Sequence, residues 1–178
     1  MKYLIVPIIL ISGMVNITFL QAQTINIPSL NDIVSVTDCE RHTSDVKNII
    51  EWLISNRFDN DTLTRKQARD FVFNWVRKNE KVQVKPYGNI LMPVLKSKSQ
   101  KFNEEFMTTY LGGMTLYAME YPDSAYSVSI QRKGIETIIE VWNKNKDLLT
   151  DYDKLTLYNS LIEKNELEKW IYKNILHK

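Results

Sequence analysis

Cys39 and His42 are the residues best suited to metal binding or nucleophilic chemistry, because they stand three positions apart. A thiolate and an imidazole can both ligate zinc, and a histidine can activate a neighbouring cysteine. A structural zinc site takes four such ligands. The sequence offers no second cysteine and only one other histidine, His177. We therefore expect an ordinary loop at these residues, with no metal or other cofactor.

Pairs of carboxylates are the second possible source of chemistry, because glycoside hydrolysis uses two carboxylates across a cleft. Glu136 and Glu140 lie one helical turn apart, and Glu104 and Glu105 lie near the start of an expected helix, where negative charge favours the helix dipole. Spacing along one helix does not place carboxylates across a cleft. We predict no catalytic residues, and a small periplasmic carboxylate-dependent hydrolase is kept as an alternative.

Motifs for nucleotide binding and serine hydrolysis are absent from the sequence. Gly112 and Gly113 are flanked by helix-forming residues and lack the strand and turn of a dinucleotide-binding fingerprint. An interior helical glycine costs about 1 kcal/mol relative to alanine. The pair therefore predicts either the close approach of a neighbouring helix or a kink.

Aromatic side chains are the most distinctive feature of the composition, with four tryptophans and nine tyrosines. Trp75 and Trp142 fall on apolar helical faces and are expected in the core. Trp52 falls off the apolar stripe of its helix, and Tyr87 lies in a cluster of turn residues. We predict that Trp52 and Tyr87 form an exposed contact patch for a partner.

Thr62 and Ser124 are candidate sites of modification. They stand in the sequences Asp-Thr-Leu and Asp-Ser-Ala, which resemble the acceptor pattern for O-glycans on exported proteins of Bacteroidota. Both residues are expected in turns between helices, where an enzyme could reach them. The same residues are also typical of helix starts, so a purely structural role remains open.

The length and charge of the chain narrow its class. A chain of 178 residues forms one domain by the usual prior of roughly 100–200 residues per domain. Its 23 basic and 21 acidic residues are interspersed. Nucleic-acid binding requires a concentrated basic face, and the densest basic cluster, residues 96–101, is expected to be a solvated loop. Nucleic acid is therefore not an expected partner.

Residues 1–23 have the parts of a secretory signal peptide: Lys2, an apolar run from Leu4 to Ile11, and the small residue Ala22 near the end. We expect export to the periplasm or the cell exterior. An uncleaved signal anchor is the alternative, since the weakly apolar stretch of about 18 residues is at the short end of what spans a bilayer. After cleavage no transmembrane span is expected.

The remaining chain predicts an all-α fold. Residues 24–43 are expected to be an extended lead-in, and residues 44–178 a single helical domain. Apolar spacing predicts an irregular antiparallel bundle of five or six helices. One of them is capped at Thr64 and has Arg65 on its polar face. The others are expected near residues 44–55, 99–121, 124–146, 151–164 and 165–175. Residues 82–95 predict either a small β-hairpin or an apolar loop that crosses the core.

Several segments resemble small exported α-helical proteins of unknown function from Bacteroidota. They are Phe-Asn-Trp at 73–75, Tyr-Leu-Gly-Gly-Met at 110–114 with Tyr-Ala at 117–118, Lys-Gly-Ile-Glu at 133–136, and a lysine-rich stretch over 154–173. The resemblance covers most of the chain beyond the signal. It implies a helical fold and an envelope location, and it assigns no catalytic residue.

These observations favour an exported, non-enzymatic protein that binds an envelope protein or a cell-surface polymer. Leu111 and Gly112 followed by Tyr117 are also similar to a tetratricopeptide unit, although no copy of this motif recurs at a fixed period. A tetratricopeptide-like helical scaffold is therefore a further alternative.

Overall fold

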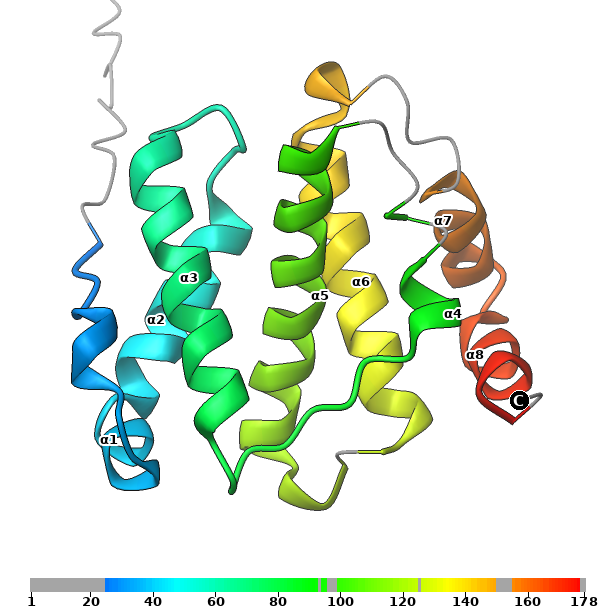
Figure 1. Ribbon diagram of the computed structural model, residues 1–178. Helices are drawn as coiled ribbons and strands as arrows, with labels where there is room; N and C mark the ends of the chain where they lie inside the picture. The colour runs from blue at the N-terminus through cyan, green and yellow to red at the C-terminus, as the bar shows by residue number, and fades with distance from the viewer. Residues whose placement is uncertain (1–24, 93, 96–98, 125, 150–154, 177–178) are drawn as a thin grey trace, which may run out of the picture.

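Helical hairpins stand side by side in the computed structural model, which describes residues 25–92, 94–95, 99–124, 126–149 and 155–176 (Figure 1). The predicted signal segment, residues 1–23, lies outside the described residues. The α-helices are α1 (Val36–Arg41), α2 (Thr43–Ser55), α3 (Thr62–Lys78), α4 (Gly88–Leu91), α5 (Gln100–Glu120), α6 (Val128–Lys144), α7 (Leu155–Glu163) and α8 (Leu167–Leu176). Short 3-10 turns occur at Leu30–Asp32, Pro122–Ser124 and Lys146–Leu148.

The all-α prediction is confirmed. The hairpin of α2 and α3 packs against the hairpin of α5 and α6, and α7 and α8 pack on α6 (Figure 1). The six expected helices correspond to α2, α3, α5, α6, α7 and α8, whereas α1 and α4 were not predicted. The hairpins differ in length, so the fold lacks the equal units of a tetratricopeptide array.

Short polar side chains start the long helices by accepting hydrogen bonds from free backbone N–H groups. Thr64 N donates to Asp61 Oδ1 at 3.1 Å, and Ile130 N donates to Ser127 Oγ at 3.2 Å. Because Asp61 is the cap, α3 begins at Thr62 and the predicted cap at Thr64 is wrong.

The prediction of an extended lead-in over 24–43 is wrong in its second half. Ser35 and Asp38 form a capping box that starts α1. Cys39 on this helix is buried, and Trp75 Nε1 of α3 donates a hydrogen bond to its carbonyl oxygen at 2.7 Å. Ile33 is buried as well, so the lead-in forms part of the core.

The β-hairpin suggested for 82–95 is not formed. Across the described part of this segment there is no strand: residues 83–87 have no regular structure and α4 follows at 88–91. Val82 and Val84 pack against the core cluster while Ile90 and Leu91 are buried in it. The apolar crossing loop is therefore the correct alternative, because these side chains find partners on neighbouring helices and need no second strand.

The glycines of α5 allow close packing of helices, as expected. A Cβ atom at Gly113 would stand 2.8 Å from Thr137 Cβ and 3.1 Å from Lys133 O of α6, and one at Gly112 would stand 2.8 Å from Ile50 Cγ2 of α2. These distances leave no room for a methyl group. Close approach is the reason for both glycines.

Candidate functional site

The first halves of α3 and α5 are joined by a buried ionic cluster, which sets the distance between these two helices. Arg65 Nη2 lies 2.8 Å from Glu105 Oε2, and Arg69 Nη1 pairs with the other carboxylate oxygen. Arg65 also donates to the carbonyl oxygens of Leu53 at 3.1 Å and Asn56 at 3.0 Å. Arg65 and Glu105 are buried, so the pairing replaces their lost hydration.

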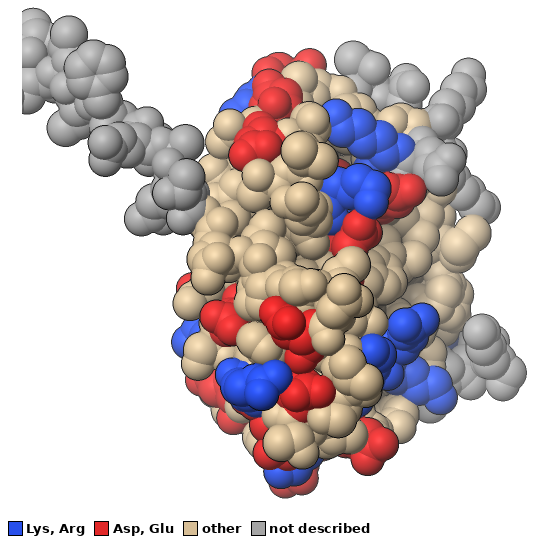
Figure 2. Space-filling view, turned by 60° about the vertical axis from the view of Figure 1, so that its left-hand side comes forward, with Lys and Arg blue, Asp and Glu red and all other residues tan. Residues whose placement is uncertain are grey.

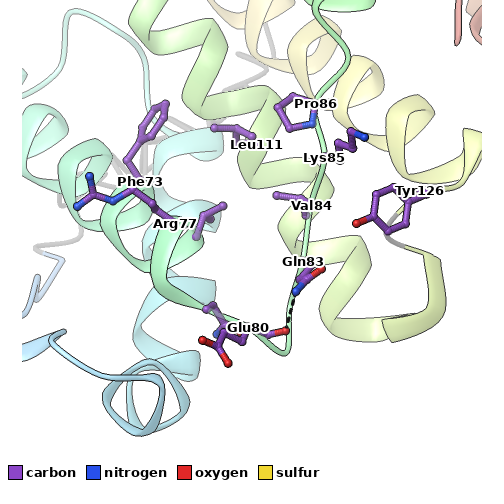
Figure 3. A pocket seen from close by; sticks show the side chains of 11 residues that line it. Phe73, Arg77, Glu80, Gln83, Val84, Lys85, Pro86, Leu111 and Tyr126 are labelled. Carbon is purple, nitrogen blue, oxygen red and sulfur yellow. Dashed lines mark hydrogen bonds between the residues drawn. The ribbon is translucent and has the colours of Figure 1, made fainter.

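Beyond this cluster, a hollow of about 590 Å³ opens between the second half of α3 and the middle of α5; we call it the α3–α5 groove (Figure 3). This volume falls within the range of small-molecule binding pockets, roughly 300–1,000 Å³. Most of the exposed lining is apolar. The lining residues are Phe73, Val76, Arg77, Asn79, Glu80, Gln83, Val84, Lys85, Pro86, Leu111 and Tyr126.

One side of the groove is formed by residues 79–87, here called the crossing segment, which runs from the end of α3 across α5 to α4 (Figure 1). Its start is held by Asn79, whose Oδ1 accepts hydrogen bonds from Lys81 N at 2.9 Å and Val82 N at 2.7 Å. Its far end is held by Gln131 of α6, whose Nε2 donates to Lys85 O at 2.8 Å. Both ends are therefore fixed by buried polar side chains.

Aromatic rings and charges lie around the mouth of the groove. Phe73 is 42% exposed and Tyr126 is 61% exposed, although both are large and partly apolar. Lys85 Nζ lies 5.6 Å from the centroid of the Tyr126 ring. Arg77 donates to Asn74 Oδ1 at 3.3 Å. Within the part of the chain that the structure describes, neither Arg77 nor Lys85 forms an ion pair, so both cations can receive an anion from a partner.

The predicted contact patch of Trp52 and Tyr87 is not formed. Trp52 is only 8% exposed and packs among α1, α2 and α3, with the Arg65 guanidinium carbon 5.8 Å from its ring centroid. Its burial was missed because α2 contacts α3, α5 and α6 and so buries more than one stripe. Tyr87 is half-buried against the other core cluster. The groove residues Phe73 and Tyr126 were not singled out from the sequence, since isolated exposed aromatics carry no periodic signal.

The candidate O-glycan acceptors occupy different environments. Thr62 is exposed at the first position of α3. Ser124 is half-buried at the end of a 3-10 turn, and its hydroxyl donates to Tyr121 O at 2.6 Å. Of the two, Thr62 is the one an enzyme could reach without breaking a hydrogen bond that the structure shows.

Cys39 and His42 do not form a nucleophile pair that a substrate can reach. Cys39 is fully buried, and burial raises the pKa of its thiol, which disfavours the reactive thiolate. His42 Nδ1 lies 2.7 Å from Asp45 Oδ2 instead. Across the described ranges, no group of three or more histidine, cysteine or acidic residues is arranged to hold a metal ion.

A second hollow, of about 320 Å³, lies between α5, α6 and α8 and gathers Glu120, Glu136 and Glu168. Arg132 occupies the position between two of these carboxylates, at 2.7 Å from Glu136 and 3.0 Å from Glu168. These ion pairs raise the pKa of Arg132 and connect α6 to α8. Two of the three carboxylates at this hollow are therefore paired with one guanidinium.

Basic and acidic side chains lie next to one another on the face shown in Figure 2, with broad uncharged surface between them. None of the helices in the described ranges is both long and apolar enough to cross a membrane. Comparison with known proteins identifies no relative: no family model, no curated protein and no solved structure matches this chain.

Proposed function

We propose that this is an exported, non-enzymatic protein of the cell envelope that binds a partner protein through the α3–α5 groove. The observation that carries the proposal is the groove itself: an apolar hollow with two cations at its rim and two exposed aromatic rings. A concave, mostly apolar surface with a few polar groups is a common form of binding site.

The exposed rings support a protein partner. Aromatic residues and arginine are enriched among the residues that contribute most to protein–protein affinity. Full burial of a phenylalanine side chain contributes about 1.5–3 kcal/mol. Phe73 is 42% exposed and so retains much of this surface for a partner to cover. Arg77 and Lys85 outnumber Glu80 in the groove, so they favour a partner whose contacting segment is acidic.

Export rests on the sequence of residues 1–23 and is tested separately. Mass spectrometry of the protein recovered from its native host is expected to find a mature N-terminus near residue 24. A protein that keeps residues 1–23 and sediments with membranes would instead identify a signal anchor.

The binding proposal is tested by photo-crosslinking in the native host. Benzoylphenylalanine in place of Phe73 is expected to form an adduct with one envelope protein. The same probe in place of Tyr172, which is exposed on α8 outside the groove, is expected to form none. Arg77→Glu should reduce the adduct at position 73 several-fold, whereas Lys173→Glu, an equal charge change on α8, should leave it unchanged. Equal adducts at both positions, or no effect of Arg77→Glu, would refute this binding surface.

A further inference from the structure

We infer that the α3–α5 groove takes an extended segment of the partner protein, which pairs with the crossing segment as an added β-strand. The inference rests on the proposed function and names the form of the ligand: an extended peptide with apolar side chains and neighbouring acidic ones. Extended peptides commonly bind in this way, with main-chain hydrogen bonds for affinity and side-chain pockets for specificity.

The hydrogen bonds of the crossing segment show which backbone group faces α6. Lys81 N and Val82 N both donate to Asn79 Oδ1 in a turn that ends at Val82, and beyond this turn Lys85 O accepts from Gln131 of α6. Exposure also alternates along the segment: Val82 and Val84 are half-buried and Gln83 is exposed, as in an extended chain with one face on the protein.

In an extended chain, the N–H and C=O of one residue point to the same side and those of the next residue to the opposite side. Since Lys85 O faces α6, an extended backbone places the N–H and C=O of Val84 on the side away from α6. Neither of these two groups has a hydrogen-bond partner among the residues that the structure describes. Val84 therefore offers one donor and one acceptor to an incoming strand, as the residues of an exposed sheet edge do.

The groove also has places for the side chains of such a strand. Phe73, Val76 and Leu111 line the groove together with Val84, and alternate apolar side chains of the ligand would be buried against them. Arg77 and Lys85 stand on the two sides and favour acidic residues between the apolar ones (Figure 3). Pro86 has no N–H and limits the pairing to a few residues.

Other ligands satisfy only part of this arrangement. A fatty acid would use the apolar surface and one cation, but it has no backbone to pair with Val84. An amphipathic helix satisfies its own main-chain groups and presents side chains every three or four residues. The proposed ligand therefore differs from both in two properties. Its apolar side chains alternate with a period of two, and its binding depends on a main-chain N–H group.

The test uses the full-length protein and a displayed library of random twelve-residue peptides. We expect enrichment of peptides with apolar residues at alternate positions and acidic residues between them. N-methylation of an enriched peptide, one position at a time, should weaken binding roughly three- to tenfold at the one central residue whose N–H pairs with Val84 O and leave the residues on either side unaffected, because one lost hydrogen bond has a modest net value.

A matched pair of variants of this protein tests the same main-chain pairing. Val84→Pro removes the N–H that would pair with the ligand and should weaken peptide binding to the same extent. Gln83→Pro removes the N–H that an extended backbone places on the opposite side and should leave binding unchanged; thermal unfolding checks that both variants are folded. If Val84→Pro does not fold, the N-methylation series still decides the question.

The outcomes separate this inference from the proposed function. Enriched peptides that tolerate N-methylation at every position, or that show helical spacing, would overturn strand addition while leaving the binding surface in place. Strand addition would also be overturned if the library gave no enriched peptide and the protein bound dodecanoate in a way that Phe73→Ala abolishes. That result would assign the groove to small apolar acids. Loss of the crosslinking result at position 73 would refute the proposed function itself.

Discussion

Arg65 Nη2 and Glu105 Oε2 lie 2.8 Å apart in the interior between α3 and α5, although the two residues are 40 positions apart in the chain. The Arg65 guanidinium also faces the Phe58 ring, at 5.2 Å from its centroid. Burying two charges is costly unless pairing and further hydrogen bonds replace hydration. The carbonyl oxygens of Leu53 and Asn56 provide those bonds, so this pair connects α2, α3 and α5 above the groove.

Glu105→Gln is expected to destabilise the protein by about 3–5 kcal/mol, because it leaves Arg65 and Arg69 buried without a neutralising charge. Urea unfolding measures this change. Lys66→Ala breaks the exposed pair of Lys66 with Asp70 and should cost less than about 1 kcal/mol. Equal losses for the two variants would contradict the role assigned to the buried pair.

Gly113→Ala is expected to destabilise the protein by about 1–2 kcal/mol: overpacking costs about 1–3 kcal/mol, and the better helix propensity of alanine recovers part of it. The new methyl group would press on Thr137 and on the backbone of α6. Gly88→Ala is the control, since a Cβ atom there meets nothing within 4 Å and should change stability by less than about 0.5 kcal/mol. A stabilised Gly113→Ala variant in thermal unfolding would show that α5 and α6 can separate at this point.

The Cys39 thiol is expected to be unreactive toward Ellman's reagent in the folded protein at pH 8 and to react fully in urea. It is buried, and burial raises its pKa. Absorbance at 412 nm follows the reaction. Rapid reaction without urea would mean that α1 separates readily from α3. In that case Trp75→Phe, which removes the hydrogen bond to Cys39 O, should not increase the rate of thiol reaction further.

The Asp38 carboxyl is expected to titrate well below its ordinary value, with a pKa of about 2, mainly because the Ser35 hydroxyl and then the backbone N–H groups of Ser35 and Val34 donate to it. Its folded pKa lies below its unfolded pKa. Its contribution to stability is therefore complete above about pH 4 and is lost as the pH falls through about 2.

Carbon chemical shifts of the Asp38 carboxyl, followed against pH, measure this value. Ser35→Ala should raise the pKa of Asp38 toward the ordinary range, whereas Ser35→Thr retains the hydroxyl and should leave it low. A pKa near 3.8 in the unmodified protein would contradict the capping box at the start of α1.

Periodicity in the sequence predicted the helices that matter most for the fold. Four apolar residues of α3 recur at helical spacing and are all buried: Ala68, Phe71, Val72 and Trp75. Side chains three to four residues apart lie on the same face of a helix, whichever surface that face contacts. The helical glycines also predicted a close contact correctly. The balance of charges and the absence of nucleotide-binding motifs narrowed the candidate functions, because both can be read from residues close together in the sequence.

Only the tertiary structure decided which polar positions are interior and where the candidate site lies. Arg65 sits on the polar side of its helix by sequence, yet Glu105, from a distant helix, makes its burial possible. Trp52 was expected at the surface and is covered because α2 has neighbours on several sides. The groove depends on how α3 and α5 are placed and on the path of the crossing segment, which Asn79 and Gln131 hold at its two ends. Those are relations between segments far apart in the chain, and no local pattern encodes them.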